Sequence, residues 1–410
     1  MNLVIINIDS IRIGHPLPFS LRDEGGVLLA AKGFVVSSRA DLELMIGRRS
    51  QLFIDVDEFE NQRRAYVGKL HDMVRKDKSL GQIAGAQIYS SDLDPYQNSA
   101  HPSEPDWLDL QAQTHAMLRD TNAETFYARL DKLQLELSRH TRSNPDGALF
   151  ALIHLSSSEM RMYSATHAML VSVMCELAAR EVLKWPPALD ATLSKAALTM
   201  NISMTELQDR LTLQKEPPSP EQQVQITEHP ERSANILMEL GVTDSIWLAA
   251  VRDHRAKVPG TLATRTESQR LARLIQRADM FAARLAPRAS RPPETPASAM
   301  HACYFDENSK VDEIGAALIK AVGIYTPGSF VRLATDEVAA VIKRGANTTT
   351  PRVAVLINRN GMPTGELIVR DTSKREFRIV SGVAHRDVKV KINLDRLMAL
   401  TKSTASDRHW

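Results

Sequence analysis

The sequence is poor in cysteine and in aromatic residues, and both shortages limit the kinds of protein it can encode. Its 410 residues include only two cysteines, Cys175 and Cys303. This number excludes a disulfide framework and a zinc site built from thiolates, since both need more cysteines. Because aromatic residues make up only 5% of the chain, we expect cores of Leu, Ile, Val and Ala, with the 15 Met as filler.

The chain also lacks an excess of charge of one sign and a long apolar run. It carries 51 Lys and Arg against 49 Asp and Glu, a net charge of +2, whereas nucleic-acid-binding proteins have a clear basic excess. No apolar run approaches the roughly 18 residues that span a bilayer. Residues 1–8 contain no basic region or cleavage site and are followed by Asp9, unlike a secretory signal. We therefore expect a cytoplasmic protein with no membrane span and no nucleic-acid polymer as partner.

Residues 1–85 are expected to form a small mixed α/β domain. Short apolar runs predict strands, and longer periodic runs behind a capping residue predict helices. In chain order the predicted elements are a strand at 3–6, a turn at 24–26, a helix at 38–47, a strand at 52–54 and a charged helix at 60–77. Residues 86–106 contain prolines that break any regular period, so we expect them to be a linker.

Residues 107–323 are expected to be helical, because apolar residues recur there at helical spacing, most clearly over 163–183. From residue 324 the pattern changes to short β-rich runs, with Asn360-Gly361 as a hairpin turn. Residues 324–400 are therefore expected to form a small β-rich C-terminal module, and 401–410 a loose tail. The sequence as a whole predicts a mainly α multidomain protein.

Four residues of the helical region are candidate metal ligands: His167, His229, His254 and Asp279. A helical bundle can direct such side chains inward, and imidazoles with a carboxylate suit Mn, Fe, Ni or Zn. No two of these residues form an i, i+4 pair, however. By spacing alone, buried or surface histidines with no metal are the commoner interpretation.

Short motifs around these candidates occur in an order that resembles the HD-GYP family of cyclic-di-GMP phosphodiesterases. The matching segments are Tyr163 to His167, Lys215 to Glu221, His229-Pro230 with the helix after it, Arg277 to Phe281, and Gly323 to Ser329. The resemblance covers about residues 145–345 and implies a helical HD-type domain. It also implies metal ligation by the four candidates and phosphate binding by Arg288 and Arg291. Residues 28–33 look like the small domain often found ahead of such phosphodiesterases.

The sequence departs from the family at both of its signatures. Where the resemblance places the His-Asp dyad, the chain has Met200 and Asn201, and Met204 stands where a Lys meets substrate phosphate. Near His254 only one His of the second signature is present, and the GYP residues are replaced. Asp253 is a candidate substitute ligand there.

These departures favour a degenerate member of the family. We expect a signalling protein that senses cyclic-di-GMP or contacts other signalling proteins, without full phosphodiesterase activity. We expect no bound cofactor; if one is held, it is a divalent transition metal, Fe or Mn. The alternative is an active metal-dependent cyclic-di-GMP phosphodiesterase with an altered ligand set.

Overall fold

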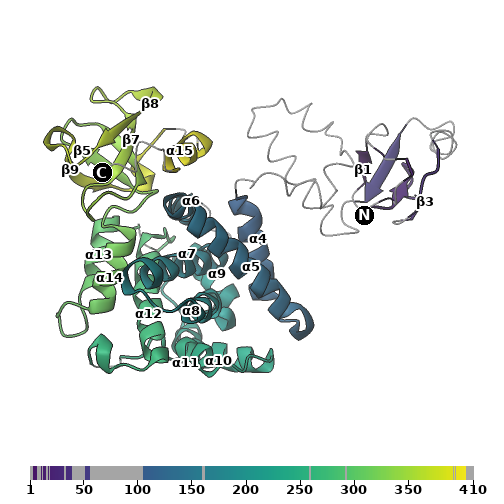
Figure 1. Cartoon of the computed structure of the whole chain (residues 1–410), viewed down its shortest axis with the longest axis horizontal. Coiled ribbons are helices and arrows are strands. Elements are labelled where there is room, and N and C mark those ends of the chain that lie inside the picture. The colour runs from purple at the N-terminus through teal and green to yellow at the C-terminus, as the bar shows by residue number, and fades with distance from the viewer. Residues whose placement is uncertain are drawn as a thin grey trace. The chain divides into compact units, whose positions relative to one another are not determined.

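The computed structural model describes most of the chain in two compact units, Met1–Asp109 and Leu110–Trp410, which we treat separately (Figure 1). The described residues are 3–6, 11, 13–14, 17, 19–31, 34–38, 51–55, 105–158, 162–257, 260–290, 293–390, 392 and 394–402. Three kinds of prediction fall outside them: the helices at 38–47 and 60–77 apart from Ser38, nearly all of the linker, and all but the first two residues of the tail. No helix among the described residues is long and apolar enough to cross a membrane.

The first unit contains a small antiparallel sheet whose strand order is β1-β4-β2-β3. Its strands are β1 (Leu3–Ile6), β2 (Leu21–Arg22), β3 (Leu28–Ala30) and β4 (Leu52–Asp55). The strands predicted at 3–6 and 52–54 are thus confirmed. The turn at 24–26 is also present, and Gly26 adopts a φ of 82° there, in the left-handed region that glycine enters without steric cost.

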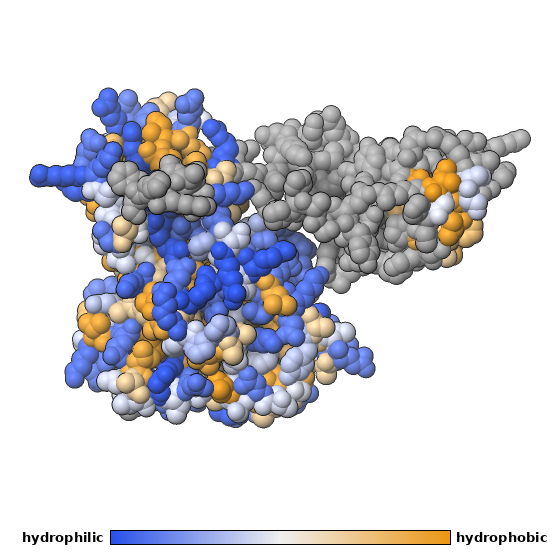
Figure 2. Space-filling view, viewed as in Figure 1, coloured by the Kyte–Doolittle hydropathy of each residue, from blue (hydrophilic) through white to orange (hydrophobic). Residues whose placement is uncertain are grey.

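The second unit is helical up to residue 322, as the sequence predicts. Its helices are α4 (Trp107–Arg119), which begins in the first unit, α5 (Ala123–Ser143), α6 (Pro145–Ser158), α7 (Tyr163–Leu177), α8 (Pro187–Thr199), α9 (Thr205–Leu213), α10 (Pro220–Glu239), α11 (Ser245–Asp253), α12 (Glu267–Leu285), α13 (Pro296–Tyr304) and α14 (Glu313–Val322). Figure 2 shows mainly hydrophilic residues on the visible face of these helices, with hydrophobic residues in scattered patches.

Helix α7 forms the centre of this bundle. All its residues from Tyr163 to Leu177 are buried, and it packs against α6, α8, α9 and α12. It continues as the π-helix η4 (Ala178–Leu183), which confirms the helix predicted over 163–183. At its start, the Asp209 carboxylate of α9 accepts the backbone N–H of Ser164 at 2.7 Å. This contact satisfies one of the free N–H groups of the first helical turn and fixes the end of α7 that carries His167.

Helix α10 begins earlier than the sequence motif suggests. The expectation places a helix after His229-Pro230, whereas the helix starts at Pro220 and includes both residues. Ser219 and Gln222 form a reciprocal capping box there, and proline is well suited to the first helical position. Pro230 therefore lies inside the helix, where it cannot donate a backbone hydrogen bond.

The remaining residues form a five-stranded antiparallel sheet in the order β8-β7-β6-β5-β9. Its strands are β5 (Phe330–Leu333), β6 (Val338–Lys343), β7 (Arg352–Ile357), β8 (Pro363–Asp371) and β9 (Ile379–Val383). The predicted Asn360-Gly361 turn joins β7 to β8, with a Gly361 φ of 76°. The described part of the protein is mainly α, with two small antiparallel sheets.

A helix that the sequence analysis did not predict, α15 (Leu394–Thr401), follows the sheet and packs on α6 (Figure 1). Thr401, which the sequence analysis assigns to the tail, is its last residue and is buried. The sheet is also tied to the helices by Arg344, whose guanidinium lies 2.7 Å from carboxylate oxygens of Asp146 and of Glu181.

Candidate functional site

The structure brings the four candidate ligands together around one cavity of about 190 Å³. His167 from α7, His229 from α10 and Asp279 from α12 line it. His254, at the end of α11, is fully buried and contacts His229 directly. Asp253, the candidate substitute ligand, is not among the lining residues.

His229 and His254 meet through their Nε2 atoms, which lie 3.2 Å apart. The Nδ1 atom of each ring lies 2.7 Å from a backbone carbonyl oxygen, that of Ile226 for His229 and that of Val251 for His254. Since a carbonyl oxygen only accepts, both Nδ1 atoms carry the proton and donate it. In the neutral rings, both Nε2 atoms then present lone pairs to each other.

Pro230 explains why the Ile226 carbonyl is free to hold His229. In a regular α-helix that carbonyl would accept the backbone N–H four residues later, which is position 230. Proline has no N–H, so the carbonyl accepts His229 instead. We infer that Pro230, by freeing this carbonyl, helps to orient the imidazole of His229.

Burial keeps this pair neutral near pH 7. Burial and, to a smaller extent, the neighbouring His254 lower the pKa of His229 to about 4. Burial likewise lowers the pKa of His254, although Asp279 acts in the opposite direction. Neither ring therefore supplies the proton that would turn the contact between the two Nε2 atoms into a hydrogen bond.

His167 and Asp279, in contrast, form a hydrogen bond with each other. His167 Nε2 lies 2.7 Å from Asp279 Oδ1, and because an ionised carboxylate only accepts, the imidazole donates. Burial acts to raise the pKa of Asp279, but the hydrogen bond and charge of His167 outweigh it, and the pKa falls to about 2. Tyr163 Oη lies 3.1 Å from the other ring nitrogen of His167.

The donor set fits one metal ion better than two. With metal–nitrogen bonds of about 2.1 Å, a single ion could contact both Nε2 atoms of His229 and His254, whose Nδ1–H groups are already held by carbonyls, as in many metal sites. His167 Nε2 and Asp279 Oδ1, the atoms with which these two residues would bind a metal, are hydrogen-bonded to each other. Within the described part of the chain, no group of three or more His, Cys, Asp or Glu side chains is arranged to hold a metal.

Two of the three positions that depart from the family motif also line the cavity. Asn201, which follows α8, and Met204, just before α9, face the same space as His167, His229 and Asp279. Met200 is buried at the end of α8 and is not a lining residue. Neither an amide nor a thioether carries charge, so these two positions add none to the cavity.

Arg288, a predicted phosphate-binding residue, lines the cavity as well. Its guanidinium carbon lies 6.0 Å from the centre of the Tyr163 ring. Arg291, its predicted companion, lies outside the described residues.

Comparison with known proteins gives a relative and a solved structure. No family model matches the chain. A Pseudomonas aeruginosa protein named cyclic di-GMP phosphodiesterase PA4108 is 24% identical over 286 residues, which cover 68% of this chain and 67% of the relative. A solved structure, described as Bd1817, a HDG"Y"P protein from Bdellovibrio bacteriovorus, has a TM-score of 0.43 and 17% identity, and covers 77% of this chain and 98% of that chain.

The match to the relative covers 68% of this chain, and the ordered motifs lie in its helical region. The chain is similar to a cyclic di-GMP phosphodiesterase and carries short motifs that resemble those of HD-GYP proteins. Sequence reasoning about this site missed Arg255, which follows His254 in the chain and lines the cavity. Its only sequence signal was that adjacency. Asp209 was missed too, because its contact with Ser164 joins residues 45 positions apart.

Proposed function

We propose that this HD-GYP-like protein is a signalling protein that binds cyclic-di-GMP, or contacts other signalling proteins, without full phosphodiesterase activity. The observation that carries the proposal is the placement of Asn201 and Met204 in the cavity beside His167, His229 and Asp279. The resemblance implies an Asp and a Lys at those two positions. The cavity therefore lacks a carboxylate and a phosphate-binding cation where the family has them.

The loss of the carboxylate bears on the chemistry. Hydrolysis of a phosphodiester by two metals needs ions about 3.5–4 Å apart, which stabilise the attacking and leaving oxygens. A neutral amide is a poor bridge between two cations, so Asn201 argues against a second ion. One Fe or Mn ion would be held by His229 and His254, with His167 and Asp279 as further candidate ligands. A bound ion would supply Lewis acidity and lower the pKa of a water molecule.

The alternative function, an active phosphodiesterase with an altered ligand set, also has an observation in its favour. The facing lone pairs of His229 and His254 are an arrangement that a cation would stabilise. The named activity of the Pseudomonas aeruginosa relative supports cyclic-di-GMP as the ligand under both functions. The cytoplasmic location expected from the sequence stays a prediction.

Binding and turnover measured on the same preparation separate the two functions. The purified full-length chain is titrated with cyclic-di-GMP in a calorimeter, and the mixture is then analysed for linear dinucleotide after incubation with Mn²⁺ or Fe²⁺. We expect binding without turnover. Hydrolysis at the rate of the Pseudomonas aeruginosa relative, assayed in parallel, would establish the alternative.

A further inference from the structure

Two arginines at the cavity stand out because the described residues give them no ion-pair partner. Most of the arginines of α11 and α12 form ion pairs. The paired residues are Arg252 with Glu231, Arg273 with Glu307 and Asp312, Arg277 with Asp312, and Arg284 with Glu294. Among the described residues, neither Arg255 nor Arg288 has an ion-pair partner, and both line the cavity.

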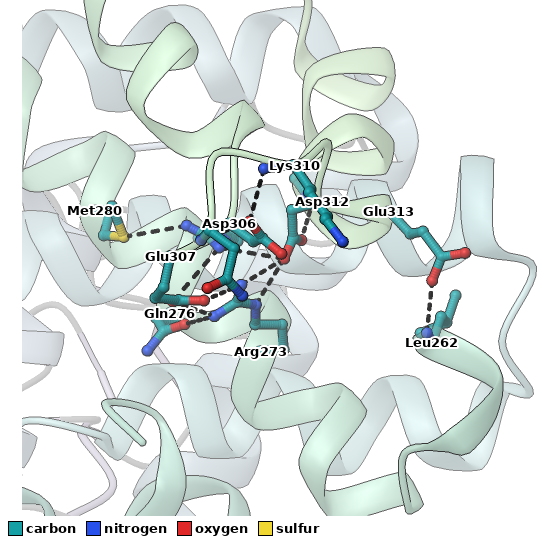
Figure 3. A network of polar contacts seen from close by, with 12 residues as sticks. Leu262, Arg273, Gln276, Met280, Asp306, Glu307, Lys310, Asp312 and Glu313 are labelled. Carbon is teal, nitrogen blue, oxygen red and sulfur yellow. Dashed lines mark hydrogen bonds and ion pairs between the residues drawn. The ribbon is translucent and has the colours of Figure 1, made fainter. Parts of the chain in front are cut away.

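In contrast to Arg255 and Arg288, the α12 arginines Arg273 and Arg277 are paired with carboxylates in a network (Figure 3). Arg273 contacts Asp312 at 2.6 Å and Glu307 at 2.7 Å, and the Asp312 carboxylate also accepts the backbone N–H of Gly315 at 2.7 Å. The charges of Arg273 and Asp312 are therefore already paired with each other in the protein. Arg255, on the turn after α11, is exposed and free of such contacts with the described residues.

The cavity itself offers Arg255 and Arg288 little negative charge. Asp279 is the acidic residue of its lining, and that carboxylate already accepts a hydrogen bond from His167. Asp279 also interacts electrostatically with Arg255, so an anion that enters this space meets two guanidinium groups and a single carboxylate in the cavity lining.

Arg255 also borders a second cavity, of about 330 Å³. Asp279 lines both cavities, and Lys257 adds a further exposed cation to the second one. Other lining residues of that cavity, Gln276, Met280 and Glu307, belong to the network in Figure 3. A phosphate at Arg255 would leave room on either side for the rest of a larger molecule.

We propose that Arg255, together with Arg288, binds a phosphate group of the ligand directly and without a metal ion. A guanidinium donates two parallel hydrogen bonds to two phosphate oxygens, which gives both charge and geometry. The inference rests on the proposed function, and it names the phosphodiester of a nucleotide as the chemical group that this site recognises.

The test is a titration of the full-length protein with cyclic-di-GMP in EDTA, repeated with inorganic phosphate as a second probe. Arg255→Gln is expected to weaken cyclic-di-GMP binding about 10-fold or more, the loss of a charge-assisted pair. Arg255→Lys is expected to retain part of the affinity. Arg252→Gln is the matched control, because it removes the same charge three residues away, outside both cavities, and is expected to bind as the wild type does.

The outcomes separate this inference from the proposed function. Equal cyclic-di-GMP affinity in wild type and Arg255→Gln overturns the inference and leaves cyclic-di-GMP binding in place. Binding that requires added Mn²⁺ also overturns it. If wild type binds no cyclic-di-GMP, the proposed nucleotide ligand fails. Inorganic phosphate then decides the inference: binding lost in Arg255→Gln supports it, and no binding by wild type overturns it.

Discussion

The Nε2 atoms of His229 and His254 face each other at 3.2 Å while both Nδ1 atoms donate to backbone carbonyls. On the proposed function this pair would hold one divalent ion, and the neutral Asn201 would offer no bridge to a second. We expect a stoichiometry of at most one Mn²⁺ or Fe²⁺ per chain, measured by elemental analysis after dialysis against the metal. His254→Gln is expected to abolish that binding. The control is His301→Gln, an exposed histidine on α13. Two tightly held ions per chain would contradict the prediction.

Pro230 is expected to set the tautomer of His229. In Pro230→Ala the new backbone N–H can donate to the Ile226 carbonyl and compete with His229 Nδ1. The helix should gain stability, by about 1–3 kcal/mol, because a proline leaves its interior. Two-bond ¹H–¹⁵N NMR of His229 should show less of the Nδ1–H tautomer, while thermal unfolding shifts upward. Gln225→Ala, on the exposed side of the same helix, should change neither measurement. An unchanged tautomer population would show that proline does not orient the ring.

Restoring the His-Asp dyad alone is not expected to restore turnover. Met200→His with Asn201→Asp returns an imidazole and a carboxylate, but the second signature is still missing, and Arg255 still follows His254. We expect no hydrolysis of cyclic-di-GMP above the wild-type level in an assay for linear dinucleotide. Metal content measured on the same sample shows whether the new side chains bind an ion. Robust hydrolysis by the double variant would mean that the second signature is dispensable.

Asp190, on α8, is expected to make stability depend on pH. Burial raises the pKa of Asp190 from 3.8 to about 6, and the nearby Glu176 raises it too, although Arg142 and Arg180 oppose the change. Because the folded state holds this proton more tightly than the unfolded state, stability from this group is greatest below about pH 4. It is lost as the pH rises toward 6.

Asp190→Asn should therefore stabilise the protein at pH 7.5, by about 1–3 kcal/mol, and have little effect at pH 4.5. Urea unfolding at the two pH values measures the difference. Asp120→Asn, at an exposed site, serves as the comparison. A gain from Asp190→Asn that is the same at both pH values would rule out titration of this carboxyl as its cause.

Local chemistry in the sequence determined much of the fold. The helical spacing over 163–183 predicted α7 with η4, short apolar runs predicted β1 and β4, and Asn360-Gly361 predicted the β7–β8 turn. These features are readable because they depend on periodicity and on the φ preferences of single residues. The start of α10 was missed because the Ser219 capping box, not the His-Pro motif, begins that helix.

For the site, the sequence by itself determined which residue types are present: three histidines and an aspartate, with Asn201 and Met204 where the resemblance implies charged residues. Only the tertiary structure decided which of these side chains contact one another. His167 pairs with Asp279 across 112 residues, and His229 meets His254 across 25. The structure also placed Arg255 at the border of two cavities. Such contacts join separate helices, and their distances, burial and protonation follow from packing, which no local pattern in the chain encodes.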